Sequence, residues 1–171
     1  NVNIYAKSSN KADVSSEAVT LSIANINVSI SEAIDKNITN AIVTGDTNIV
    51  AKGSLNIHAT GNSDITAQLQ TKTVSGVTLS YLSNEVTADS ETNAVIKDVN
   101  GVVTINGLNL TADTDKLSAT SKTNGTTIAG YNATLTGSGA NMTAKMTAGV
   151  DSLKQDETKK GLTINNNGQT L

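Results

Sequence analysis

One segment of this chain recurs twice at a constant spacing. The segment Val2–Ala6 (VNIYA) returns 53 residues later as Leu55–Ala59 (LNIHA) and another 53 residues later as Leu108–Ala112 (LNLTA). A second landmark, Thr39–Val43, keeps the same offset from Thr92–Ile96. Two independent landmarks at one period indicate a repeat protein, and periods of this length are typical of solenoids, propellers and arrays.

The composition favours a narrow, aliphatic core. The chain contains no Phe, Trp, Pro or Cys, and its only aromatic residues apart from one His are Tyr5, Tyr81 and Tyr131. Aromatic side chains bury large areas in ordinary globular cores, whereas a thin solenoid is filled by stacked Val, Ile, Leu and Ala. Thr, Asn and Ser make up 63 of 171 residues, but Val and Ile alternate with them along the whole chain, which predicts order.

The charges argue against nucleic acid as a partner. All 12 basic residues are Lys, and the net charge is −3. Arg is the usual residue for bidentate recognition of phosphate, and a net negative chain with few aromatics is a poor nucleic-acid binder. The absence of Cys excludes disulfides and thiolate metal sites. We expect no small-molecule substrate and no cofactor.

Alternation of apolar and polar residues is the main local signal, and it predicts strands. In residues 19–30 the alternation slips by one residue across Ala24-Asn25, which predicts a corner or a bulge. Other segments share the alternation: Val2–Ala6, Ala41–Val43, Ile49–Ala51, Leu55–Ala59, Ile65–Leu69, Val77–Leu82, Ala94–Ile96, Val102–Ile105, Leu108–Ala112, Ile128–Leu135 and Ala140–Ala148. Gly- and Asn-rich breaks between them predict turns.

Two alternatives to a coil of parallel strands stay open at this point. Asn-Gly pairs such as Asn106-Gly107 favour hairpins, so a meander of antiparallel strands is possible. A short helix is the alternative for Ser29–Thr44, although its Asn, Thr and Ile residues disfavour a long one.

The fold class predicted is all-β, a parallel β-helix with repeats at about 2–54, 55–107 and 108–160. We interpret one period as two or three coils of roughly 18 to 27 residues, which predicts a rod of roughly 30 to 45 Å. The charge-dense tail, 151–171, is expected to be irregular or a cap, with Leu162–Ile164 opening the next coil. The chain starts at Asn1, and we expect it to be a fragment of a longer one.

The order of the strands resembles a known family. Small-residue strands in Ser75–Ala88 lead to Thr92–Asp98 (TNAVIKD) and then to Gly101–Ala112 (GVVTINGLNLTA). This pattern is similar to the passenger repeats of very large secreted bacterial adhesins of the leukotoxin and filamentous-haemagglutinin type. The resemblance covers nearly the whole chain to about Val150.

That resemblance implies a right-handed parallel β-helix at the bacterial outer cell surface or secreted from it. It implies a host-cell surface receptor or glycan and an outer-membrane export barrel as partners, and adhesion or cytotoxicity as the role. It transfers no catalytic residue. The alternatives are a β-helix segment of a phage tail fibre or spike, and a polysaccharide-processing β-helix enzyme.

The residues themselves offer little chemistry. His58, the only histidine, should point outward because Leu55 and Ile57 point inward, and no carboxylate is located beside it to complete a triad. Carboxylate pairs occur at four places, and we expect solvated turns there, with weak Ca²⁺ binding possible at Asp113/Asp115: Glu32/Asp35, Asp89/Glu91, Asp113/Asp115 and Asp156/Glu157. No catalytic, cofactor or metal site is predicted.

Asn recurs at one position of the repeat, as Asn3, Asn56 and Asn109. With two or three coils per period, these side chains would lie about 10 to 14 Å apart and could not touch. The sequence as a whole predicts a non-enzymatic, stiff structural or adhesive segment.

Overall fold

The computed structural model describes residues 1–151, 162–166 and 169–170, and in them the chain is built from strands without helix. Three long strands dominate: β1 (Val2–Gly45), β3 (Ser54–Val99) and β5 (Gly107–Val150). Short strands lie between and after them: β2 (Ile49–Val50), β4 (Gly101–Ile105), β6 (Leu162–Asn166) and β7 (Gln169–Thr170).

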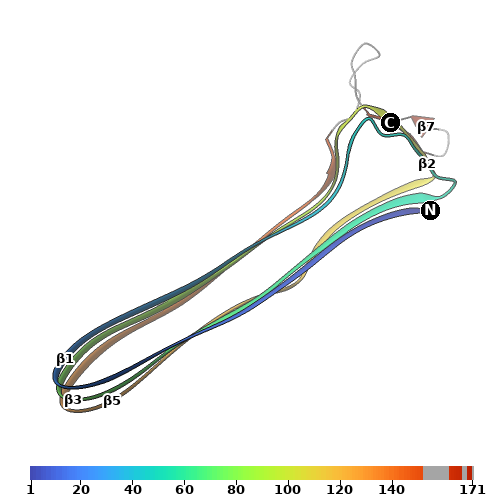
Figure 1. Cartoon of the computed structure of the whole chain (residues 1–171). Coiled ribbons are helices and arrows are strands. Elements are labelled where there is room, and N and C mark those ends of the chain that lie inside the picture. The colour runs from blue at the N-terminus through green and yellow to red at the C-terminus, as the bar shows by residue number, and fades with distance from the viewer. Residues whose placement is uncertain (152–161, 167–168, 171) are drawn as a thin grey trace.

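Each long strand makes one complete excursion. It runs away from the base, where the N-terminus and β2 lie, turns at the far end and runs back (Figure 1). We call the two halves the outgoing leg and the return leg, and the far end the distal end. A short strand at the base then links one excursion to the next.

The excursions stack in parallel with like residues side by side. The long strands form one sheet in the order β1-β3-β5, and the short strands form another in the order β2-β4-β6-β7. Val2 pairs with Leu55, and Leu55 pairs with Leu108. The prediction of parallel strands is therefore confirmed, while the antiparallel meander and the helix at Ser29–Thr44 are wrong among the described residues.

The number of coils per period was predicted wrongly. The residues that recur at an offset of 53 are direct hydrogen-bonded neighbours, so one period is one circuit and not two or three. The error came from assuming short strands. Gly-containing breaks such as Gly61-Asn62 and Asn124-Gly125 lie inside β3 and β5, where we expected turns.

The tail corrects a second expectation. Leu162 was expected to open a new coil beside Leu108, but β6 pairs with β4, with Leu162 opposite Gly101. β6 therefore belongs to the same circuit as β5. Most of the charge-dense segment, including the Asp156/Glu157 pair, lies outside the described residues.

The interior lies between the outgoing and return legs and is filled in layers. Near the base, an apolar cluster includes Leu55, Ile57, Ala94 and Ile96, and farther out a second contains Ile65, Ala67, Val86 and Ala88. Because the two legs lie face to face over a short distance, small aliphatic side chains fill the space and aromatic ones are not needed.

A polar layer separates the two apolar clusters. The Ser8 hydroxyl donates to Asn37 Oδ1 over 2.8 Å, and the Asn37 amide donates to the carbonyl of Asn62 over 2.9 Å. The Asn10 amide donates to Asp35 Oδ1 over 3.0 Å, and Ser63 donates to the other Asp35 oxygen. These bonds join the two legs and satisfy groups that would otherwise be costly to bury.

The bend at the distal end depends on close backbone approach. The alternation of buried and exposed residues in β3 changes phase between Gly76 and Val77, at the position equivalent to Ile23-Ala24 in β1. This agrees to within one residue with the predicted slip. A Cβ on Gly76 would lie 2.8 Å from the carbonyl oxygen of Ile23, so a larger residue would push the circuits apart.

The repeated Asn residues form a ladder on the outer surface. The Asn56 amide donates to Asn3 Oδ1 over 2.7 Å, and the Asn109 amide donates to Asn56 Oδ1 over 2.7 Å. Asn93 donates to Asn40 in the same way over 2.9 Å. The expectation that these side chains cannot touch is wrong, because one period advances the chain by a single strand spacing.

The central circuit should contribute most to stability. Ile57 in β3 is 1% exposed, whereas Ile4, at the same position of β1, is only partly buried. We expect Ile57→Ala to lower the free energy of unfolding by about 2–5 kcal/mol, and Ile4→Ala by clearly less. Urea denaturation followed by circular dichroism compares them, and equal losses would contradict this account of the stack.

The molecule should scatter X-rays as a long, thin particle. A leg of about 20 residues spans roughly 70 Å, while three stacked strands span only about 10–15 Å. We therefore expect small-angle X-ray scattering of the monomer to give a maximum dimension of roughly 70 Å. A maximum near the 30 to 45 Å expected from the sequence would contradict the single-circuit arrangement.

Candidate interaction surface

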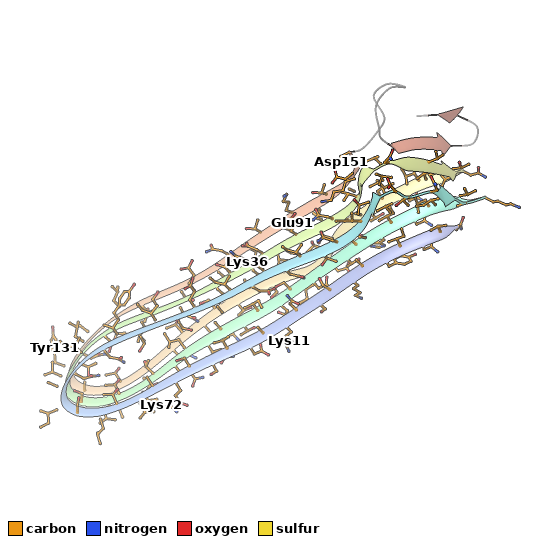
Figure 2. All side chains as sticks on the ribbon, turned by 45° about the horizontal axis from the view of Figure 1, so that its top comes forward. Lys11, Lys36, Lys72, Glu91, Tyr131 and Asp151 are labelled. Atoms are coloured by element: carbon orange, nitrogen blue, oxygen red, sulfur yellow. The ribbon has the colours of Figure 1, made fainter. Side chains whose placement is uncertain are left out.

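The outer surface of the distal end is apolar. On the return leg, alternate residues face outward from all three circuits, and they form what we call the distal face: Ile26, Val28 and Ile30 of β1, Val77, Leu79 and Tyr81 of β3, and Tyr131 and Leu135 of β5. The outgoing leg and the bend add further exposed apolar residues, among them Val19, Leu21, Ile23, Val74 and Ile128. Tyr131 lies at the bend in Figure 2.

The register of the stack brings these side chains into ladders. Ile26 pairs with Leu79, while Val28 pairs with Tyr81 and Tyr81 with Leu135. Shallow apolar grooves run between the side chains, one bordered by Ala24, Ile26, Val77 and Leu79. Ile26 is 78% exposed, which is unusual for an isoleucine within a regular sheet.

The inside of the same region is polar. The residues buried between the legs at this end are Thr71, Thr73, Ser75, Thr78 and Ser80. Nearer the base, Leu and Ile are buried between the legs. The apolar residues of 19–30, whose alternation predicted strands, face outward here. The alternation alone does not say which set faces in.

Charges are absent from this whole end. No Asp, Glu or Lys occurs in 18–31, 73–84 or 123–144. The first charges on the outgoing leg are Glu17 and Lys72, whose carboxylate and ammonium groups lie 2.8 Å apart. A contiguous apolar surface without charge, bordered by polar residues, is the usual mark of an interaction site.

The contacts of His58 do not match the geometry of a catalytic triad. Its Nε2 lies 3.1 Å from Asp113 Oδ2 and 2.9 Å from Thr60 Oγ1, so both partners use the same ring nitrogen. A triad needs the carboxylate on one nitrogen and the nucleophile on the other. His58 does point outward as predicted, but Asp113 was not foreseen as its neighbour because that contact depends on the register of β5 against β3.

The described carboxylate pairs also do not assemble into a site. Asp35 lies inside the polar layer. Glu91 accepts from the Asn93 amide over 3.1 Å and lies 3.5 Å from Lys145 Nζ. In the part of the chain that the structure describes, no three His, Cys, Asp or Glu side chains gather closely enough to hold a metal ion. Within the same part, no helix has the length and apolarity to cross a membrane.

The comparisons with known proteins give no relatives: no family model, no curated protein and no solved structure matches this chain.

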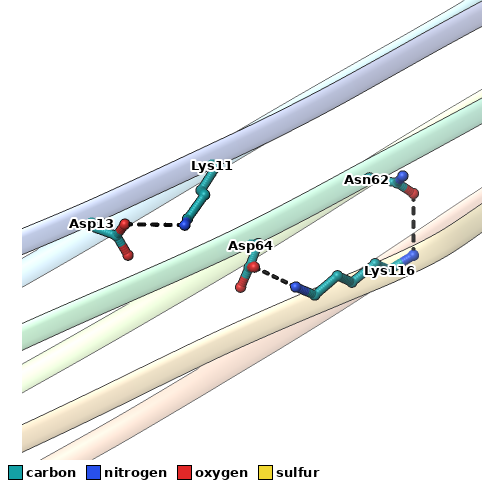
Figure 3. Close-up of polar contacts among 5 residues, drawn as sticks. All are labelled: Lys11, Asp13, Asn62, Asp64 and Lys116. Carbon is teal, nitrogen blue, oxygen red and sulfur yellow. Dashed lines mark hydrogen bonds and ion pairs between the residues drawn. The ribbon is translucent and has the colours of Figure 1, made fainter.

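Two ion pairs lie on the outgoing legs, one between neighbouring strands and one within β1 (Figure 3). Lys116 contacts the Asp64 carboxylate and its backbone N–H donates to Asn62 Oδ1 over 3.2 Å, while Lys11 Nζ lies 3.6 Å from Asp13 Oδ2. The hydrogen bond from Lys116 lowers the pKa of Asp64, and Lys11 contributes the smallest lowering effect.

We expect Lys116→Gln to raise the pKa of Asp64 toward its ordinary value, and Lys11→Gln to change it little. A depressed carboxyl pKa stabilises the fold above the unfolded pKa, and that contribution disappears as the pH falls through the folded pKa. Carboxyl ¹³C chemical shifts followed through an acid titration measure both variants. Equal changes in the pKa of Asp64 in the two variants would show that Lys116 has no special role.

Proposed function

We propose that this chain is a structural and adhesive segment of a large secreted bacterial surface protein, of the leukotoxin and filamentous-haemagglutinin type. Its circuits wind as a right-handed β-helix, the hand that parallel connections favour. The scaffold is rigid and non-enzymatic, and the distal face is the surface that contacts a component of the host-cell surface.

The observation that carries this proposal is the distal face itself. Three circuits expose eight apolar side chains in register, on a surface without a charged residue. Leaving this much apolar surface in water is unfavourable, by about 25 cal/mol for each Å². Covering it with a partner recovers that free energy, so the arrangement suits binding better than it suits a passive spacer.

The scaffold supports the same role. The distal face lies at the end of the excursions farthest from the base, where the links between circuits run (Figure 1). Backbone hydrogen bonds and the Asn ladders hold the three circuits in register. A contact surface built on continuous strands keeps its shape better than one built on loops.

An enzymatic role has less support. A polysaccharide-processing site needs two carboxylates across a cleft, whereas Glu32 and Glu85, which face each other in register, lie on neighbouring strands of one sheet. The geometry of His58 also disfavours nucleophilic chemistry.

Binding of the fluorescently labelled protein to cultured epithelial cells tests the proposal. We expect Ile26→Ser and Leu79→Ser each to weaken binding about tenfold or more, because each removes an apolar side chain whose burial is worth about 1.5–3 kcal/mol. Flow cytometry over a concentration series gives the apparent affinities.

Val50→Ser is the matched control. Val50 is 77% exposed, close to the 78% of Ile26, but it lies in β2 at the base. We expect its binding to equal that of the unmodified protein. If the unmodified protein does not bind, or if Val50→Ser weakens binding as much as Ile26→Ser, the distal face is not the adhesive surface.

A further inference from the structure

The distal end reverses the usual polarity of a protein. In β3, which has a neighbouring strand on each side, Thr73 and Thr78 are buried between the legs, while Val74 and Leu79 face outward and are 45% and 54% exposed. Nearer the base, the same strand buries its aliphatic residues. In water the distal arrangement is unfavourable, because burial favours apolar groups and costs polar ones. In lipid the preference is the opposite, since apolar side chains face the acyl chains and polar groups bond one another inside.

The exposed apolar residues lie on both outer surfaces of the bend. Val74 stands on the outgoing leg, in a row with Leu21 and Ile128, and Leu79 stands on the return leg beside Ile26. The two legs face each other across the interior, so side chains that face outward from them point away from each other, and side chains project all around the bend (Figure 2). A partner with one binding surface covers one side, whereas lipid surrounds whatever enters it.

The backbone of the central circuit stays paired through the bend. Val77 pairs with Ala24 on one side and with Tyr131 on the other. The Ser75 hydroxyl donates to the carbonyl oxygen of Val77 over 2.6 Å, so a polar side chain in the bend is bonded within the chain. Unpaired backbone groups are costly in hydrocarbon, and the paired backbone of β3 suits such surroundings.

The charges limit how deep the distal end can enter lipid. The first charged residues of β3 on either side of Gly76 are Lys72, four residues before it, and Glu85, nine residues after it. At about 3.3 Å per residue, Lys72 stands roughly 13 Å from the bend, and the hydrocarbon of one leaflet is about 15 Å thick. A Lys at that level can extend its ammonium group to the headgroups. The charge-free end therefore matches the depth of one leaflet and is too short to span a bilayer.

We propose that the distal end inserts into the outer leaflet of a phospholipid bilayer, to about the level of Lys72, and that acyl chains cover the apolar side chains of both legs. The inference rests on the proposed function, since it names the partner of the distal face as the lipid of the host-cell membrane. The absence of Lys from 18–31, 73–84 and 123–144 leaves no basic cluster there for anionic headgroups. Zwitterionic lipid such as phosphatidylcholine is therefore the lipid that the surface fits.

Flotation with phosphatidylcholine vesicles, which carry no protein or glycan, tests the proposal. We expect the unmodified protein to float with the vesicles and its binding to depend little on NaCl concentration, because no ion pairs are screened. Val74→Ser and Leu79→Ser should each weaken binding about tenfold, since each removes an apolar side chain from the lipid. Val50→Ser, at the base, is the matched control and should bind as the unmodified protein does. Circular dichroism verifies that the variants fold.

A fluorescent reporter measures insertion directly. The chain contains no Trp, so Leu79→Trp introduces a single Trp at the distal end and Val50→Trp introduces one at the base. Phospholipids with brominated acyl chains quench Trp that lies among them. We expect strong quenching for Leu79→Trp and none for Val50→Trp. Equal quenching of the two would overturn the proposal.

The outcomes separate this inference from the proposed function. Protein that binds cells but not vesicles has a protein or glycan partner, which overturns the inference and leaves the adhesive role standing. Vesicle binding without cell binding does the reverse. Binding weakened by Leu79→Ser but not by Val74→Ser is a one-sided contact and overturns insertion, as does binding that requires anionic lipid. Self-association that Leu79→Ser abolishes, without vesicle binding, would assign the surface to a second copy of the chain.

Discussion

The in-register pairing of each circuit with the next is the constraint on which the rest of this structure depends. Parallel strands with an offset of 53 or 54 residues place equivalent positions side by side over more than 40 residues. Every side chain therefore has a neighbour from the same position of the repeat. Apolar residues form continuous columns, and polar residues must satisfy one another along the stack.

The consequences differ with the chemistry of each position. Asn suits a column because one amide both donates and accepts, so Asn3, Asn56 and Asn109 bond in series. Like charges directly opposite each other repel, and Glu32 opposite Glu85 is one such pair, but the ion pairs are offset. Lys72 reaches Glu17, and Lys116 reaches Asp64, each from a register position that differs from that of its partner.

The same constraint builds the distal face. Because positions repeat down the stack, an apolar residue on the outer surface of one circuit is continued by Leu79 or Tyr81 in the next, and a patch grows with each circuit.

Local patterns in the sequence determined the period, the strand content, the corner near Ala24 and the outward direction of His58, because each depends on residues close in the chain or on the repeat itself. The length of the circuit, the inward direction of Thr73 and Ser80, and the contacts of Asn56 and of His58 with Asp113 were decided only by the tertiary structure. They depend on where a strand turns and which circuit it lies against. Alternation has the same appearance whichever face is buried, so packing between the two legs makes that choice.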